Sequence, residues 1–239
     1  MHSEMTLYAL RDDSCVLHLP MNEGEGSIVY DYSRYGNNGQ IIGANWTTGK
    51  FGKALSFDGV DDYVDVGNIA IHNQPSYTIT MWVKGPPGQK DKRVFSEGST
   101  SSDTPIFTIG TDVSGTSGKL DIHIRADDET TELYHQKTTS EPFDNAWHFI
   151  AWVDNSGDFK IYIDGMLDTE GSYFKSTKSL NRDTIGAVGR STYSHFFNGL
   201  IDEVRIYNRA LSKEEIKSLY LYYQNFEVRP CILCPRPTI

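Results

Sequence analysis

One carboxylate in this sequence occupies a position where an ionised group is costly. Residues 197–212 begin with alternating polar and apolar side chains, and strict period-two alternation places Asp202 on the same strand face as Leu200, Val204 and Ile206. A carboxylate on an apolar face destabilises the fold unless it is ion-paired, hydrogen-bonded or bound to a metal. We therefore expect Asp202 to have a partner.

Oxygen donors that suit a hard cation stand in or beside several turns. Ca²⁺ takes about six to eight oxygens from carboxylates, amide side chains and backbone carbonyls. The candidate metal ligands are Asp31, Asn38, Asp58 and Asp202. Alternatively, Asp31 and Asn38 form Asx turns and Asp202 accepts backbone hydrogen bonds. We interpret Asp61, Asp62 and Asp65 as a solvated hairpin edge.

Aromatic side chains in loops are candidates for sugar binding, because their rings stack on the apolar faces of pyranoses while polar neighbours take the hydroxyl groups. Tyr193 and His195 lie in the loop 190–196, directly before the last strand, and Tyr35 and Trp46 lie in or beside the turn that begins at Asp31. We expect these four to surround one rim. The alternative is packing within the fold, since aromatic residues make up 12% of the chain.

The motifs of several enzyme classes are missing from the sequence. Retaining glycoside hydrolases need two carboxylates about 5 Å apart, and the adjacent Asp202 and Glu203 point to opposite faces of a strand. The chain has no Gly-x-Ser-x-Gly elbow, phosphate-binding loop or His-Glu-x-x-His helix. We therefore assign no catalytic residue and expect binding without turnover.

The elements that position these residues are short alternating strands. Residues 78–83 and 147–153 alternate with period two, and Gly, Asn, Asp and Pro turns separate such runs, which is typical of an antiparallel sandwich. Residues 155–158 and 164–165 predict hairpin turns. Ser212 begins a capping box that predicts a short helix to about Tyr223. We expect residues 85–117 to be the least structured stretch and residues 171–181 to form another loop.

Seven segments in a fixed order carry a resemblance to a known family. They are 16–26, 31–39, 49–59, 61–64, 79–84, 147–151 and 161–165, and the last strand follows them. From about Val16 to Tyr220 the chain resembles the laminin-G-like, concanavalin-A-like jelly-roll family. This resemblance implies an all-β, two-sheet antiparallel sandwich with a short C-terminal helix. It also implies adjacent first and last strands, so that Asp202 approaches the Asp31–Asn38 turn, where family members often hold calcium.

A weaker resemblance concerns two strand motifs of jelly-roll alginate lyases. Residues 121–125 and 173–175 are similar to these motifs, but Asp121 stands where such enzymes need Gln, and their Tyr-x-Gln ending is missing. His123 and Arg125 share a strand face. We interpret His123 as an ordinary residue of that face.

Cysteines and charge restrict the partners and the compartment. We divide the chain into an arm (1–14), the jelly-roll domain (15–223) and a tail (224–239). Cys15 stands beside the first strand and Cys231 and Cys234 in the tail, and we expect one tail cysteine to pair with Cys15, which requires an oxidising compartment. Free thiols and a zinc site are the alternatives. The net charge of −10 argues against a nucleic-acid partner, and no apolar segment approaches membrane-spanning length.

The leading hypothesis is an extracellular or surface-exposed, calcium-supported module that binds a glycan or glycoprotein or mediates adhesion. One alternative is a structural protein of a surface layer, filament or virus particle, in which the arm and the tail contact other subunits. The other alternative is a polysaccharide lyase or hydrolase, which a groove with paired His, Tyr and Arg side chains would favour.

Overall fold

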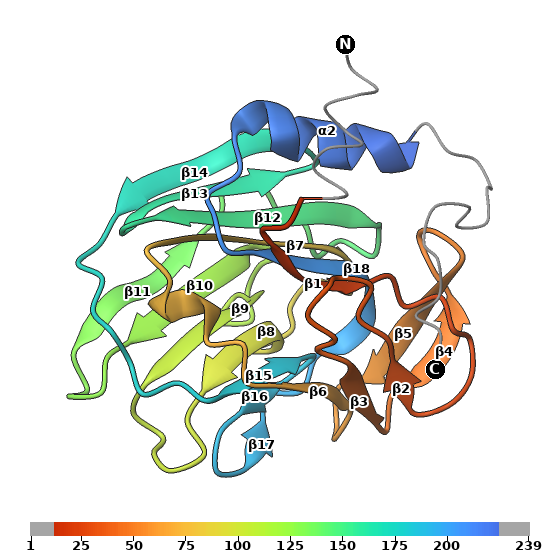
Figure 1. Ribbon diagram of the computed structural model, residues 1–239, viewed down its shortest axis with the longest axis horizontal. Helices are drawn as coiled ribbons and strands as arrows, with labels where there is room; N and C mark the ends of the chain where they lie inside the picture. Colours follow the sequence, from red (N-terminus) through yellow and green to blue (C-terminus); the bar gives the residue numbers. More distant parts are fainter. Residues whose placement is uncertain (1–11, 225–239) are drawn as a thin grey trace.

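Alternating strands pair into two antiparallel sheets that stack face to face in the computed structural model, which describes residues 12–224 (Figure 1). The strands of the first sheet, in spatial order, are β14 (Met166–Ser172), β13 (Asp158–Ile163), β12 (His148–Asn155), β7 (Ser76–Lys84), β18 (Asn198–Tyr207), β5 (Lys53–Asp58) and β4 (Asn45–Thr48), with β1 (Cys15–Leu19) also paired to β18. The predicted adjacency of the first and last strands is therefore confirmed.

The second sheet faces the first across the core. Its strands, in order, are β11 (Thr131–Lys137), β10 (Leu120–Arg125), β9 (Ile106–Thr111), β8 (Arg93–Gly98), β15 (Arg182–Ile185), β6 (Tyr63–Gly67), β3 (Gly39–Ile42) and β2 (Ile28–Val29). A small hairpin of β16 (Val188–Gly189) and β17 (Tyr193–Ser194) lies against β8. The 3-10 turn η1 (Ile71–Asn73) and helix α2 (Lys213–Gln224) complete the elements of the described residues.

The first sheet is buried on both faces along its central strands β7 and β12. Its inner face, with Ile150 and Trp152, joins the core between the sheets. Its outer face, with Trp82 and Phe149, packs against Leu219 of α2 and the residues around it. Strand β12 is therefore apolar on both sides, as expected for a strand covered from two directions.

The two predicted hairpin turns and the predicted start of the C-terminal helix are confirmed. Ser156 and Gly157 turn the β12–β13 hairpin, and Asp164 and Gly165 turn the β13–β14 hairpin, all four with positive φ. The hydroxyl of Ser212 accepts a hydrogen bond from the backbone N–H of Glu215 (3.2 Å), and the Glu215 carboxylate accepts one from the N–H of Ser212 (2.8 Å). This capping box begins α2.

The face assigned to Asp202 from strict alternation is wrong. Strand β18 changes register between Asp202 and Arg205, and Glu203 has a φ of 52°. This bulge adds a residue, so that Ile201, Val204 and Ile206 point into the core while Asp202 points to the outer face of the first sheet. The carboxylate of Asp202 is nevertheless fully buried there.

The expectation of little structure between residues 85 and 117 is also wrong. Strands β8 and β9 lie within this stretch and are buried along their whole length. Residues 173–181, which have no regular structure, are fixed by side chains. The Lys178 ammonium donates to Ser176 O (3.0 Å) and contacts His72 Nε2 (3.1 Å), and Lys175 donates to Asp154 (3.0 Å).

The disulfide between Cys15 and a tail cysteine stays a prediction. Cys15 is a buried free thiol whose Sγ donates to Leu17 O (3.2 Å), and burial raises its pKa to about 12. Cys231 and Cys234 lie outside the described residues, as do the arm up to residue 11 and nearly all of the tail. Among the described residues, no helix has the length and apolar character needed to cross a membrane.

Candidate functional site

A continuous set of polar and aromatic side chains covers one region of the second sheet, on the face turned away from the core. Strand β10 explains why. Leu120, Ile122 and Ile124 point into the core, so the alternating residues Asp121 and His123 point outward. We call this region the β8–β11 face. It consists of Asp91, Arg93, Asp121, His123, Tyr134, His135 and His195.

Asp121 is the centre of this face. Its Oδ1 lies 2.9 Å from His135 Nδ1 and 3.7 Å from a guanidinium nitrogen of Arg93. The residue is fully buried, and its other oxygen, Oδ2, has no hydrogen-bond partner in the described part of the chain. Burial raises the pKa of Asp121, although His135 and Arg93 act in the opposite direction. An unsatisfied buried carboxylate oxygen is costly.

Three rings lie beside Asp121. A bulged pairing between β10 and β11, with His135 at a φ of 47°, places the His135 ring parallel to that of His123, with centroids 4.5 Å apart. Tyr134 meets both histidines edge-on and is 76% exposed. Burial lowers the pKa of His123 to about 4, with further lowering from the charges of His135 and Arg93. His123 is therefore neutral at physiological pH, and its Nδ1 has no hydrogen-bond partner among the described residues.

The network extends to the β16–β17 hairpin. His195 Nε2 lies 3.2 Å from Asp91 Oδ2, and the other oxygen of Asp91 accepts a hydrogen bond from Arg93. The hydrogen bond from His195 is the largest of the effects that lower the pKa of Asp91 to about 2, so Asp91 is ionised. Five side chains from four segments are thus linked in the order His195, Asp91, Arg93, Asp121 and His135.

The structure separates the four predicted sugar-binding residues. His195 belongs to the β8–β11 face. Tyr193 is close in sequence, but its ring stacks on Tyr63 with centroids 3.7 Å apart, and its hydroxyl donates to Asp65 (2.6 Å). The Arg182 guanidinium also lies 5.0 Å from the Tyr193 ring centre.

Trp46 and Tyr35 lie in other parts of the fold. Trp46 is on β4, at the edge of the first sheet, where its indole N–H donates to Gly26 O (2.9 Å) and its ring packs against the core. Tyr35 lies in the β2–β3 loop, half-exposed, and its hydroxyl donates to Asp13 O (3.3 Å). Their role in binding stays a prediction.

The predicted metal ligands fall into three groups. Asp31 and Asn38 are together, because the Asn38 side-chain oxygen accepts from the Asp31 N–H (2.9 Å). Each carboxylate oxygen of Asp31 already accepts two hydrogen bonds, from the N–H groups of His18, Ser33 and Asn37 and from the Ser33 hydroxyl. Asp31 is therefore satisfied by protein donors, as in the Asx-turn alternative.

Asp202 is held by the β4–β5 turn rather than by the Asp31 turn. Its Oδ2 accepts from the N–H groups of Lys50 (2.9 Å) and Phe51 (3.1 Å). Its Oδ1 has no hydrogen-bond partner in the part of the chain that the structure describes. Burial raises the pKa of Asp202 well above its usual range, and the charge of Glu203 adds to this.

Asp58 lies in the β5–β6 turn with Asp61 and Asp62. Oxygens of these three carboxylates lie within 4.8 Å of one another. Burial raises the pKa of Asp62, and the charges of Asp58 and Asp61 raise it further. The carboxylates that come together are thus those of Asp58 and of two residues, Asp61 and Asp62, that we interpreted from the sequence as part of a solvated edge.

Sequence reasoning missed Asp91, Arg93, Tyr134 and His135. Arg93 stands in the stretch expected to be loop, and residues 131–137 contain a single aliphatic residue, Leu133, so they carry no clear alternation. The sequence indicated that His123 and Arg125 share one face of β10, but the residues that lie beside them come from other strands. The β8–β11 face offers hydrogen-bond acceptors, hydrogen-bond donors and the exposed aromatic ring of Tyr134. This combination suits a polyhydroxylated ligand.

The two-sheet sandwich and its sequence define the class of protein. A family model described as the concanavalin A-like lectin/glucanases superfamily, a laminin G model, matches residues 58–217. The chain belongs to this family, and the predicted fold class is confirmed.

Solved structures show the same fold at low sequence identity. Domain 4 of AbnA, a GH43 extracellular arabinanase from Geobacillus stearothermophilus, in complex with arabinotriose, is 20% identical with a TM-score of 0.69, covering 86% of this chain and 98% of that domain. The binding domain of Paraclostridial Mosquitocidal Protein 1 is 16% identical (TM-score 0.66), with 89% of this chain and 53% of that chain covered. The binding domain of botulinum neurotoxin DC in complex with SialylT is 17% identical (TM-score 0.67), with coverages of 89% and 52%. This chain therefore spans about half the length of the toxin domains. No curated protein matches the sequence.

Proposed function

We propose that this protein is a carbohydrate-binding module that acts outside the cytoplasm and holds a glycan on the β8–β11 face. One observation carries the proposal: the exposed ring of Tyr134 meets His123 and His135 edge-on, and His135 belongs to the linked network of polar side chains on this face. Hydroxyl groups of a sugar can bond to the partly exposed side chains of Asp91 and His195, while the apolar face of its ring packs on Tyr134.

The similar structures support this class of ligand. The arabinanase domain is described in complex with arabinotriose and as part of an extracellular enzyme, and the neurotoxin DC domain in complex with SialylT. A pentose oligosaccharide and a sialylated oligosaccharide are therefore the first probes for this chain. An adhesion role would follow if the glycan is carried by a glycoprotein.

Glycan-array screening followed by calorimetric titration of the best oligosaccharide tests the proposal. Tyr134→Ala should weaken binding about tenfold, equivalent to about 1.4 kcal/mol, because the ring supplies the apolar contact. Phe174→Ala is the matched control, since Phe174 is an exposed aromatic residue outside the β8–β11 face and its loss should change nothing.

The same titration distinguishes this face from the rim expected from the sequence. If Tyr35→Ala weakens binding while Tyr134→Ala does not, the glycan binds at the Asp31 turn and the proposed location is wrong. If no glycan on the array binds wild-type protein, the proposed function itself is wrong.

We further propose that calcium stabilises the domain through Asp58, together with Asp61 and Asp62. The mutual repulsion of three close carboxylates, one of them buried, would be relieved by a divalent cation. A cation that binds only the folded state at a hundredfold excess over its Kd stabilises by about 2.7 kcal/mol.

Chelation should therefore lower Tm, and Asp58→Asn should abolish this sensitivity. Asp31→Asn serves as the comparison. Because Asp31 already accepts hydrogen bonds from protein donors at both oxygens, this substitution should leave the effect of chelator on Tm unchanged. An identical Tm with calcium and with chelator would overturn the calcium proposal and leave the glycan proposal standing.

A second candidate function, a polysaccharide lyase, is favoured by the Asp121–His135 pair. With His135 Nδ1–H donating to Asp121, Nε2 keeps a lone pair and can accept the proton from C5 of a uronate. The C5–H electron pair then forms the C4–C5 double bond, the C4–O bond breaks, and the Tyr134 hydroxyl can protonate the departing oxygen. Ultraviolet detection of unsaturated oligosaccharides, lost in His135→Gln, would establish this activity. Glycan binding without any unsaturated product would leave the binding module alone.

A further inference from the structure

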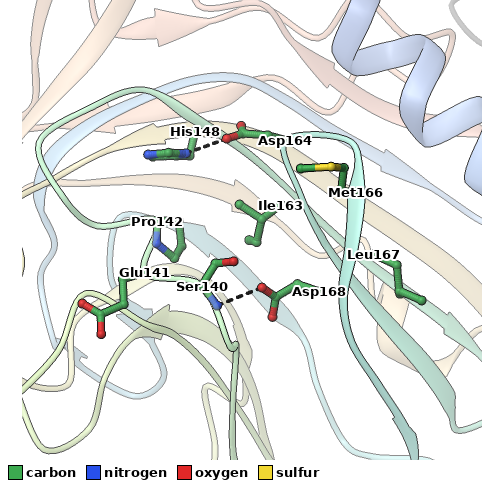
Figure 2. A pocket seen from close by; sticks show the side chains of 9 residues that line it. All are labelled: Ser140, Glu141, Pro142, His148, Ile163, Asp164, Met166, Leu167 and Asp168. Atoms are coloured by element: carbon green, nitrogen blue, oxygen red, sulfur yellow. Dashed lines mark hydrogen bonds and ion pairs between the residues drawn. The ribbon is translucent and has the colours of Figure 1, made fainter.

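A concavity lies outside the β8–β11 face, where the hairpin of β13 and β14 meets the segment that follows β11 (Figure 2). It has a volume of about 350 Å³, which is at the lower end of the range for small-molecule sites. Its walls are the segment before β12, with Ser140 and Pro142, and the β13–β14 hairpin, with Ile163 and Met166.

The floor and walls combine apolar and polar groups in a way that suits one sugar ring. Figure 2 shows Ile163 at the centre, Pro142 on one side and Met166 on the other, and Met166 is 70% exposed. The carboxylates of Asp164 and Asp168 lie on either side of Ile163. An apolar patch bordered by carboxylates matches a pyranose, which has an apolar face and hydroxyl groups at its edge.

These carboxylates are fixed before any ligand arrives. Asp164 accepts from the Phe149 N–H (2.9 Å) and from His148 Nδ1 (2.7 Å). Asp168 accepts from the N–H groups of Thr139 (2.7 Å) and Ser140 (2.9 Å), so it ties β14 to the opposite wall. A site whose acceptors are already held in place loses little conformational entropy when it binds.

The charge of the site selects the kind of sugar. Glu141, Asp164 and Asp168 line the pocket, and Asp144 lies 3.2 Å from His148 Nε2. His148 is the sole basic side chain among the lining residues, so carboxylates outnumber it even when it is protonated. A ligand with a positive charge therefore gains Coulomb energy that a neutral sugar does not.

We propose that this pocket, the β13–β14 pocket, binds a hexosamine with a free amine. The ammonium group pairs with Asp164 or Asp168, and the ring packs on Ile163, Pro142 and Met166. This site is separate from the proposed glycan site, and each can exist without the other.

Backbone amide NMR with glucosamine as the probe tests the proposal. Glucosamine should shift the amides of Ser140, Asp164 and Asp168 and bind at least tenfold more tightly than glucose or N-acetylglucosamine. The preference should decrease as salt is added, because partly exposed charges are screened. Equal binding of the three sugars, no binding, or shifts confined to other regions would overturn it.

Asp164→Asn should weaken glucosamine binding about tenfold while preserving the fold, since the amide can keep bonds to Phe149 and His148. Asp158→Asn is the matched control, because it removes the same charge from the other, exposed end of β13. If N-acetyl-lysinamide binds as tightly as glucosamine, the ring contributes nothing and the hexosamine assignment is wrong. Tyr134→Ala should leave glucosamine binding unchanged, so failure at one site is distinguishable from failure at the other.

Discussion

Individual side chains of the β8–β11 face differ in what holds them. Asp91 is ionised and both of its oxygens have partners, whereas Asp121 has one bonded oxygen and one without a partner in the described part of the chain. His135 is anchored by Asp121, whereas the half-buried His123 has no partner for Nδ1 among the described residues. The unsatisfied atoms of Asp121 and His123 are covered by protein, so a ligand on this face meets the partly exposed side chains of Asp91 and His195 instead.

The pKa of His123 supplies a prediction at the residue scale. Its folded value, about 4, lies below the unfolded value of 6.5, so protonation favours the unfolded chain. The stability that neutral His123 contributes is complete above pH 6.5 and is lost as the pH falls towards 4. The pH dependence of the unfolding free energy should become flatter over this window in His123→Gln.

His148 is the control for this measurement because its pKa is raised, chiefly by the hydrogen bond to Asp164. The stability that protonated His148 contributes is complete below pH 6.5 and is lost as the pH rises through the folded pKa. His148→Gln should therefore change the pH dependence of the unfolding free energy above pH 6.5, whereas His123→Gln changes it below. Titration of both rings by NMR checks the assignments. A value near 6.5 for His123 would show that its ring is more solvated than the structure indicates.

At the scale of elements, helix α2 is an added layer on a sheet that is already complete. It covers Trp82, on which Tyr220 stacks with ring centroids 5.7 Å apart. It also contributes Ile216 and Leu219 to the apolar cluster on the outer face of the first sheet. The helix is short and its only capping box is at Ser212, so its first turn depends on two reciprocal hydrogen bonds.

Ser212→Ala should lower the unfolding free energy by about 1 kcal/mol, the usual effect of losing an N-cap. Lys217→Ala is the matched control, since Lys217 is exposed in the middle of the same helix and Ala favours helix formation. Chemical denaturation of both variants measures the difference. Equal stability of Ser212→Ala and wild type would show that packing alone fixes the start of α2.

At the scale of the whole molecule, the first and last strands of the sandwich are paired, with Cys15 opposite Tyr207. The beginning and the end of the sandwich therefore lie side by side in the first sheet. The predicted bond between Cys15 and a tail cysteine would close a loop that includes nearly all of the domain. In the chain-entropy model such a bond stabilises by on the order of 5 kcal/mol.

Peptide mapping under non-reducing conditions decides whether this bond exists. We expect a cross-linked peptide that contains Cys15 and either Cys231 or Cys234, and a lower Tm after reduction. Three free thiols would contradict the prediction. A bond between subunits would contradict it as well and would favour the assembly alternative, in which the tail contacts a neighbour.

The sequence by itself determined the features that depend on near neighbours in the chain. Period-two alternation predicted strands such as those at 78–83 and 147–153, the Ser156–Gly157 and Asp164–Gly165 turns predicted two hairpins, and Ser212 with Glu215 predicted the start of α2. Each of these signals acts within a few residues, because backbone conformation and local hydrogen bonding respond to adjacent side chains.

Only the tertiary structure decided which strands are neighbours and where pairing departs from regularity. Alternation failed at Asp202, because the bulge at Glu203 arises from the pairing of β18 with β7. The β8–β11 face joins Arg93, Asp121 and His135 from three strands, and no local pattern specifies their proximity. Long-range pairing is set by the burial of whole sheet faces, so the residues that gather on the opposite face are known only after the sheets have formed.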